Sequence, residues 1–200
     1  MTDPKAPSAT GGTAVQPAVL FTGARVFDGR SDELTGPTTV LVADGKIASI
    51  GDSDDVPAGA LTVDAGGRTL TPGFIDAHSH IMLQPTLAEL AGTDLAFSGL
   101  FGASMARLYL SRGYTTIRDT GGNTFSLKKA IDAGMTEGPR IFPSGPIISQ
   151  TAGHGDFTPA AEPSRLVGGH RDNMQRDGHL LVVDGVPQML QAVRYVLGRG

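Results

Sequence analysis

The stretch Thr71–His80, TPGFIDAHSH, joins a short apolar run to two histidines that are separated by one residue. Phe74–His80 is predicted to form a β-strand, in which residues i and i+2 project from the same face. His78 and His80 are therefore expected side by side at the strand end, and Asp76 shares their face. Neutral imidazole is the commonest nitrogen ligand of metal ions, so the pair indicates part of a metal site. The alternative is a chance pair, because the chain has five histidines among its 200 residues.

The composition is that of an ordinary globular protein, with 18% charged residues, 40% hydrophobic residues and a formal net charge of −4. Without a surplus of positive charge, nucleic acid is not an expected partner. No apolar run approaches the roughly 18 residues of a membrane span, and the N-terminus lacks the pattern of a signal peptide. Residues 1–17 are rich in Pro, Ala, Gly, Ser and Thr, which predicts a flexible leader. The absence of cysteine excludes disulfides, thiolate metal sites and a cysteine nucleophile, and it fits a cytoplasmic protein.

Residues 18–68 are predicted to form the strands of a small antiparallel sheet. Thr38–Val42 and Lys46–Ile50 flank the dipeptide Asp44-Gly45, which is a strong short-range signal for a β-hairpin. A further strand is expected at Ala60–Val63, before the sequence changes character.

Residues 69–200 are predicted to alternate between strands and helices. The Leu95–Arg112 segment has helical spacing, and Gly113 stands where a helix commonly ends on a glycine. Strand–helix–strand repeats with short links are typical of a parallel sheet, which makes the fold class α/β. The expected strands are Phe74–His80, Tyr114–Arg118 and Arg140–Pro143, and a second helix is expected to begin at Asn123 or Thr124.

Two later segments differ in their regularity. Residues 146–184 show no clear elements, which indicates either a functional loop or poor order. Pro187–Arg199 carries an apolar stripe at helical spacing and is predicted to form an amphipathic helix.

Three stretches together resemble the metal-dependent amidohydrolase superfamily: GGRTLTPGFIDAHSH (residues 66–80), RGYTTIRDTGG (residues 112–122) and DAGMTEGPRIFPSGPIISQTAGHGD (residues 132–156). The last two are similar to the imidazolonepropionase-like branch, which includes prolidase-like and carboxypeptidase-like dipeptidases and ochratoxin-hydrolysing relatives. The resemblance covers about residues 19–200 of this chain and only the N-terminal part of a typical family member.

The resemblance implies the N-terminal portion of a (β/α)8 TIM barrel, preceded by strands of a small β-sandwich, with the barrel incomplete in this chain. Residues 18–68 would be the sandwich strands and residues 69–200 the first three βα units. Catalytic groups of such barrels lie at the C-terminal ends of the strands.

The resemblance also implies roles for individual residues. His78 and His80 would bind the more buried divalent metal, most simply zinc, with one or two ions in the complete enzyme. Asp76 would either orient an imidazole or bond backbone amides at the strand end. His154 would line the substrate pocket, and Asp156 would orient it. The remaining polar candidates are expected to be structural: Arg118 and Asp119 as an ion pair or turn cap, and His170 and His179 as surface or lid residues.

The implied function is hydrolysis of a C–N bond in a small substrate, such as a dipeptide or an N-acyl amino acid, by metal-activated water. The family's bridging lysine and its aspartate are expected beyond Gly200, so no catalytic residue is expected in this chain, which would be a truncated, inactive portion. One alternative is a non-catalytic or regulatory subunit that completes its barrel with a partner chain, and a weaker one is a simple metal-binding module. Open strand edges also favour a homo-oligomer.

Overall fold

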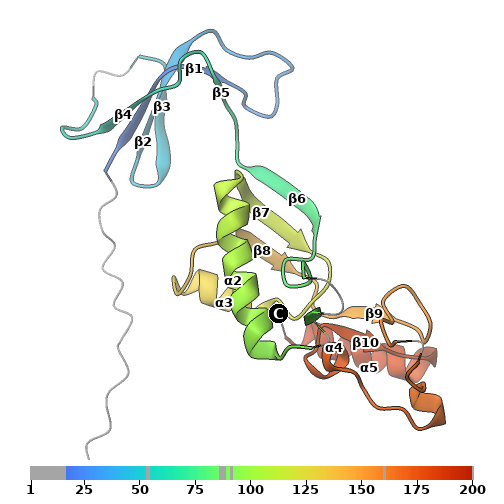
Figure 1. Cartoon of the computed structure of the whole chain (residues 1–200). Coiled ribbons are helices and arrows are strands. Elements are labelled where there is room, and N and C mark those ends of the chain that lie inside the picture. Colours follow the sequence, from blue (N-terminus) through green and yellow to red (C-terminus); the bar gives the residue numbers. More distant parts are fainter. Residues whose placement is uncertain (1–16, 53–54, 86–88, 91, 160, 200) are drawn as a thin grey trace, which may run out of the picture. The chain divides into compact units, whose positions relative to one another are not determined.

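The computed structural model describes residues 17–52, 55–85, 89–90, 92–159 and 161–199. The predicted leader, residues 1–17, lies outside the described residues apart from Pro17. The chain divides into two compact units, Met1–Pro72 and Gly73–Gly200, each of which is described by itself (Figure 1).

The first unit is a mixed five-stranded sheet with the order β3-β2-β1-β4, in which β5 also pairs with β1. The predicted hairpin at Asp44-Gly45 is confirmed: both residues have positive φ (52° and 69°), as a tight two-residue turn between β2 and β3 requires. The strands are β1 (Val19–Val26), β2 (Thr38–Ala43), β3 (Lys46–Ile50), β4 (Leu61–Asp64) and β5 (Thr69–Leu70).

The prediction that this sheet is antiparallel throughout is wrong. β1 is antiparallel to β2, but β4 and β5 run parallel to it along its other edge. β4 pairs with the first half of β1, from Val19 onward, and β5 pairs with Arg25 and Val26 at its end. Turn signals between neighbouring strands report hairpins, whereas a crossover that brings β4 in parallel leaves no local signature.

The second unit is built on three parallel strands in the order β6-β7-β8, with helices between them in the sequence. The predicted strand–helix alternation is confirmed, and the fold is mixed α/β. Asp94 begins the first helix by accepting a hydrogen bond from the Phe97 amide (3.0 Å), and Gly113 follows its end with φ of 86°. The elements are β6 (Phe74–Ser79), α2 (Leu95–Ser111), β7 (Tyr114–Asp119), α3 (Phe125–Asp132) and β8 (Arg140–Pro143).

The core of this unit lies between the sheet and its two helices. Ile117 at the centre of β7 and Ile141 in β8 are almost completely buried and contact Ala106 of α2 and Leu127 of α3. The described residues form no closed barrel, because the three-stranded sheet ends at β6 and β8.

Residues 146–184, in which the sequence showed no clear elements, contain regular structure. β9 (Ile147–Ser149) pairs in parallel with β10 (Leu180–Val182), and the 3-10 turn η1 (Arg165–Val167) and the short helix α4 (Asn173–Arg176) lie between them. Three-residue strands are too short to show a period-two pattern, and their pairing spans about thirty residues of sequence, so local signals miss them.

The last helix, α5 (Gly185–Leu197), confirms the predicted amphipathic helix and begins two residues before Pro187.

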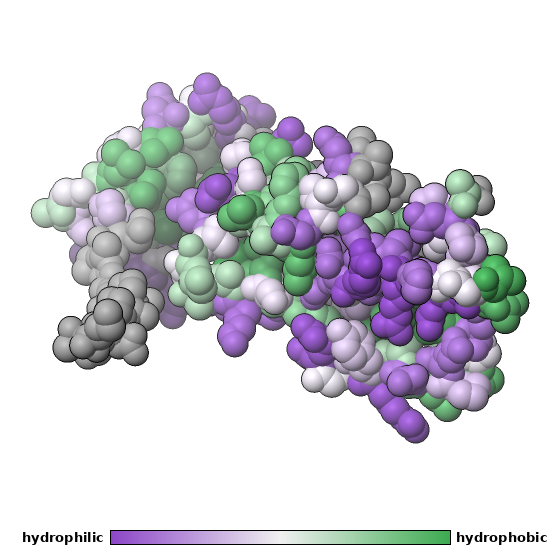
Figure 2. All heavy atoms as spheres, turned by 60° about the horizontal axis from the view of Figure 1, so that its bottom comes forward, coloured by the Kyte–Doolittle hydropathy of each residue, from purple (hydrophilic) through white to green (hydrophobic). Residues whose placement is uncertain are grey.

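Figure 2 shows hydrophobic patches interrupted by hydrophilic side chains on one face of the molecule. None of the helices in the described part of the chain is both long and apolar enough to cross a membrane.

Candidate metal centre

The carboxyl ends of β6, β7 and β8 meet at one edge of the sheet because the strands are parallel. The register places Ser79 beside Asp119, and Asp119 beside Pro143. Backbone hydrogen bonds continue past the strand ends: Thr120 N donates to Ser79 O, and Ser144 N donates to Asp119 O, both at 2.8 Å. The loops that follow the strands are therefore fixed to one another at this edge.

The two histidines of the opening motif lie together at this edge. The ring centroids of His78 and His80 are 5.1 Å apart, and the ring planes are inclined by 74°. The predicted proximity is thus confirmed, although β6 ends at Ser79, one residue before the predicted end, and its register with β7 shifts between Asp76 and Ser79. Ser79 points into the protein and is 2% exposed, whereas His78 is exposed and His80 is half-buried. Their role as metal ligands stays a prediction.

The hydrogen bonds of His80 define which of its nitrogens could bind a metal. Its Nδ1 lies 3.3 Å from the carbonyl oxygen of Gly121, and its Nε2 lies 3.5 Å from Thr120 Oγ1. A carbonyl oxygen only accepts, so this contact assigns the proton to Nδ1 and leaves the lone pair on Nε2. A histidine that binds a metal through one nitrogen commonly donates from the other to a carbonyl or carboxylate.

Gly121 allows this close approach. A Cβ atom at position 121 would lie 3.1 Å from His80 Nδ1 and 2.3 Å from Cγ1 of Ile147 in β9. The second distance is shorter than side chains tolerate, so only glycine fits between the histidine and β9.

Asp76 takes the second of its two predicted roles. Its Oδ1 accepts a hydrogen bond from the backbone amide of His78 (3.0 Å), and its Oδ2 accepts a longer one from the Tyr109 hydroxyl (3.4 Å). Burial raises the pKa of Tyr109, a hydrogen bond with Ser79 opposes that rise, and the negative charge of Asp76 adds to it. The tyrosine is therefore protonated and able to donate, and Asp76 fixes the backbone that carries His78.

Asp119 has a larger structural role than the sequence indicated. It is 0% exposed, and it accepts hydrogen bonds from the amide of Ile81 (2.7 Å) and the hydroxyl of Thr124 (2.8 Å). The ion pair with Arg118 is not formed, because Arg118 Nε donates to Ala77 O (2.7 Å) instead; the turn-cap alternative describes Asp119 better. Burial raises the pKa of Asp119, and the two hydrogen bonds oppose that rise.

These contacts tie the chain just after His80 to the beginning of α3. The hydrogen bonds of Asp119 could have been anticipated from its sequence position, because it ends β7, the strand that follows β6. Carboxyl ends of neighbouring parallel strands always meet at one edge.

His154 is exposed on the loop after β9, and Asp156 bonds the loop itself. Oδ2 of Asp156 accepts from the amide of Ala152 (2.8 Å), and Oδ1 accepts from the amide and hydroxyl of Thr158 (3.2 and 2.7 Å). Burial acts to raise the pKa of Asp156, but these hydrogen bonds outweigh it and hold the pKa below its ordinary value. Asp156 thus shapes the loop that carries His154, and the substrate-binding role of His154 stays a prediction.

The prediction that His179 is a surface or lid residue is wrong, whereas His170 is exposed as expected. His179 is 1% exposed, its Nδ1 accepts from the amide of Asn123 (3.2 Å), and its Nε2 has no partner among the described residues. Its carbonyl accepts from the amide of Ile147, so the β9–β10 pairing draws it inward. Burial lowers the pKa of His179, which is therefore neutral at pH 7.

His78 and His80 place two imidazole rings at the same edge of the sheet, which fits part of the ligand set of a metal ion such as zinc. Across the described ranges of the chain, no group of three or more histidine, aspartate or glutamate side chains is placed to hold a metal ion.

Residues 69–185, more than half of the chain, match the family model described as "Amidohydrolase family". The chain belongs to the amidohydrolase family. The predicted resemblance is thereby confirmed, and members of this family typically depend on a metal.

Individual relatives of this amidohydrolase family member agree with the match. Ochratoxinase from Aspergillus niger is 33% identical over 172 residues, which are 80% of this chain and 36% of ochratoxinase. A prolidase solved in complex with N-methylphosphonate-L-proline superposes with a TM-score of 0.73 at 33% identity, over 92% of this chain and 44% of the prolidase. A Xaa-Pro dipeptidase with methionine bound in its active site gives 0.70 at 25% identity, over 92% of this chain and 45% of the dipeptidase. The chain thus spans less than half the length of these relatives.

Proposed function

We propose that this chain carries part of the metal site of an amidohydrolase that uses a bound divalent metal, most simply zinc, to hydrolyse a C–N bond in a small substrate. The observation that carries the proposal is the His78–His80 pair, with ring centroids 5.1 Å apart at the carboxyl edge of parallel strands. We further propose that β6, β7 and β8, with α2, α3 and α5, are the first three units of a (β/α)8 barrel. In such barrels the active site lies at this edge of the strands.

His78 and Nε2 of His80 would hold the metal. When bound, the metal lowers the pKa of a coordinated water toward neutrality and polarises the carbonyl that the water attacks. The carbonyl of Gly121 keeps the His80 proton on Nδ1, and the buried Asp119 fixes the backbone immediately after His80. These groups position the ligands and need not touch the substrate.

The other ligands would come from the part of the family's fold that these 200 residues do not span, either in a longer protein or in a partner chain. Catalytic zinc generally has three protein ligands and a water, so two histidines are an incomplete set. Dipeptides and N-acyl amino acids are the proposed substrates, supported by the prolidase and dipeptidase relatives. The exposed His154 is proposed to contact the substrate. The cytoplasmic location and a homo-oligomeric state stay predictions.

The test uses protein isolated from its native cells with an antibody against residues 1–17. Its metal content is measured by atomic emission, and hydrolysis is followed by chromatography on Xaa-Pro dipeptides, other dipeptides and N-acyl amino acids. We expect bound zinc and release of a free amino acid. His78→Ala and His80→Ala are each expected to lose most of the metal and at least 100-fold in kcat/KM.

His170→Ala is the matched control, because His170 is exposed and lies in the segment between β9 and β10. It should keep both metal and activity. Full metal content in the His80→Ala protein would refute the assignment of this ligand. Metal bound without hydrolysis of any substrate class would instead favour a non-catalytic relative.

A further inference from the structure

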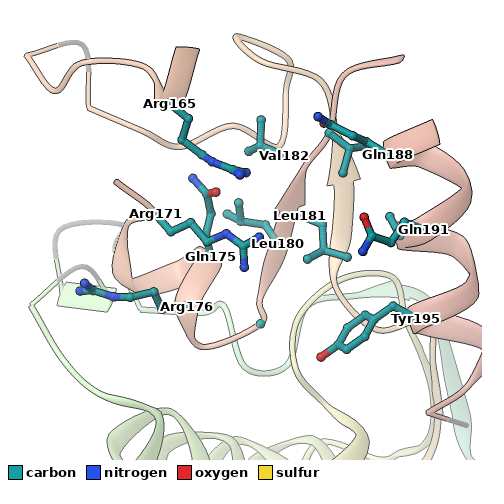
Figure 3. A pocket seen from close by; sticks show the side chains of 13 residues that line it. Arg165, Arg171, Gln175, Arg176, Leu180, Leu181, Val182, Gln188, Gln191 and Tyr195 are labelled. Carbon is teal, nitrogen blue, oxygen red and sulfur yellow. The ribbon is translucent and has the colours of Figure 1, made fainter. Parts of the chain in front are cut away.

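A cavity of about 360 Å³ lies between the segment that precedes β10, the strand β10 and the helix α5 (Figure 3). Neither His78 nor His80 lines it, and its interpretation does not depend on the proposed hydrolase activity. A volume of this size is at the small end of the range of pockets that hold small organic molecules.

The polar lining of the cavity donates hydrogen bonds and carries positive charge. Arg165 and Arg171 extend from the η1–α4 segment, and Gln188, Gln191 and Tyr195 face them from α5 (Figure 3). No aspartate or glutamate is among the described residues of the lining.

The charges of the two arginines are not neutralised by a neighbouring ion pair. Neither Arg165 nor Arg171 has an ion-pair partner within 4.0 Å among the described residues. The positive charge of Arg165 interacts with the carboxylate of Asp184 without forming an ion pair. The oxygens of Asp184 instead accept hydrogen bonds from the amide and hydroxyl of Thr151, at 3.1 and 2.6 Å. The third arginine of the lining, Arg176, bonds the Asn173 side chain and extends away from the other two (Figure 3).

Two side chains of the lining have hydrogen-bond donors that their existing hydrogen bonds do not use. The Gln188 side-chain oxygen accepts from the amide of Asp184 (2.7 Å), so its amide nitrogen remains to donate. The Tyr195 oxygen accepts from Arg199 Nη1 (3.3 Å), so its own proton is available.

The floor of the cavity is apolar. Leu181, Val182 and Val183 are half-buried and supply the accessible hydrocarbon of the lining, whereas Leu180 and Ala192 are buried. A ligand that satisfies both parts of the lining needs an anionic head for the guanidinium groups and a hydrocarbon body for the floor. Arginine pairs carboxylates and phosphates alike with two parallel hydrogen bonds, but a carboxylate is smaller and less strongly hydrated, which favours it beside an apolar surface.

We propose that this cavity, with Arg165 and Arg171 at its head and Leu181 and Val182 at its floor, binds a small carboxylic acid with an apolar or aromatic body. The nature of the ligand follows from the juxtaposition of two guanidinium groups, which have no ion-pair partner among the described residues, with the hydrocarbon side chains of β10.

The test is isothermal titration of the 200-residue chain with 4-phenylbutyrate, and with three comparison compounds. Neutral 4-phenylbutyramide keeps the body without the charge, and acetate keeps the head without the body; each is expected to bind at least tenfold more weakly. Phenylphosphate distinguishes the head groups and should bind more weakly than 4-phenylbutyrate. Affinity for 4-phenylbutyrate should fall when the salt concentration is raised from 50 to 500 mM.

The variants Arg165→Gln and Arg171→Gln should each raise the Kd for 4-phenylbutyrate at least tenfold. Arg194→Gln is the matched control, because it removes the same charge from α5 at a position that does not line the cavity. Circular dichroism of each variant checks that the fold is kept. Equal binding of the amide, equal binding of acetate, tighter binding of phenylphosphate, or an unchanged Kd in both pocket variants would overturn the proposal.

Discussion

Replacement of Asp119 by alanine should destabilise the second unit while the surface of the protein stays the same. The substitution removes the acceptor for the Ile81 amide and the Thr124 hydroxyl, at 2.7 and 2.8 Å, in a site that is 0% exposed. A hydrogen bond to a charged group contributes about 1.5–3 kcal/mol, and a donor left buried without a partner costs about 1–3 kcal/mol. Relief of the buried charge offsets part of this loss. We therefore expect the free energy of unfolding to fall by about 3 kcal/mol.

Asp119→Asn is the informative partner of that variant. Its side-chain oxygen can accept from the Ile81 amide, and its NH2 group can donate to the Thr124 hydroxyl, which can also act as an acceptor. We expect a loss below about 1 kcal/mol, because both contacts are kept without the buried charge.

Urea unfolding followed by circular dichroism at 222 nm measures these changes, because the helices among the described residues all belong to the second unit. Asp132→Ala is the control: it breaks the half-exposed Lys128–Asp132 pair (2.6 Å) of α3 and should cost about 0.5 kcal/mol. A loss below 0.5 kcal/mol for Asp119→Ala, or an equal loss for the asparagine variant, would refute the argument.

Three further outcomes are expected. Burial lowers the pKa of His179 in the folded protein, so below about pH 6.5 the unfolded chain binds a proton that the folded chain does not. The free energy of unfolding therefore falls as the pH is lowered from about 6.5 to the pKa of His179 in the folded protein. Urea unfolding at pH 7.5 and 5.5 should show a loss of at most about 1.4 kcal/mol from this group, absent in His179→Gln. Gly121→Ala places a Cβ 2.3 Å from Ile147 Cγ1 and should lower the free energy of unfolding by about 1–3 kcal/mol. A zinc titration should also show weaker binding, because the substitution disturbs His80. The control Gly99→Ala, whose Cβ would lie in open space on α2, should not destabilise the protein. Treatment of the native protein with EDTA should abolish hydrolysis, and added zinc should restore it; activity that persists without metal would contradict the proposed chemistry.

The sequence alone determined the elements whose signals are local. Asp44-Gly45 specified the hairpin because only a tight turn with positive φ connects such strands, and the helix before Gly113 followed from its periodic apolar residues and terminal glycine. The His78–His80 pair was also predictable, because the period of a strand brings residues i and i+2 together.

The tertiary structure decided everything that depends on long-range pairing. The parallel addition of β4 to β1 and the β9–β10 pairing join segments with no local signature, and the second of these buries His179. Asp119 acquired its role only when β7 lay beside β6, which brought its carboxylate to the Ile81 amide. The arginine cavity likewise exists only because β10 and α5 fold against the segment that carries Arg165 and Arg171. Local sequence fixes backbone conformation over a few residues, whereas burial and charge environment depend on which distant residues become neighbours.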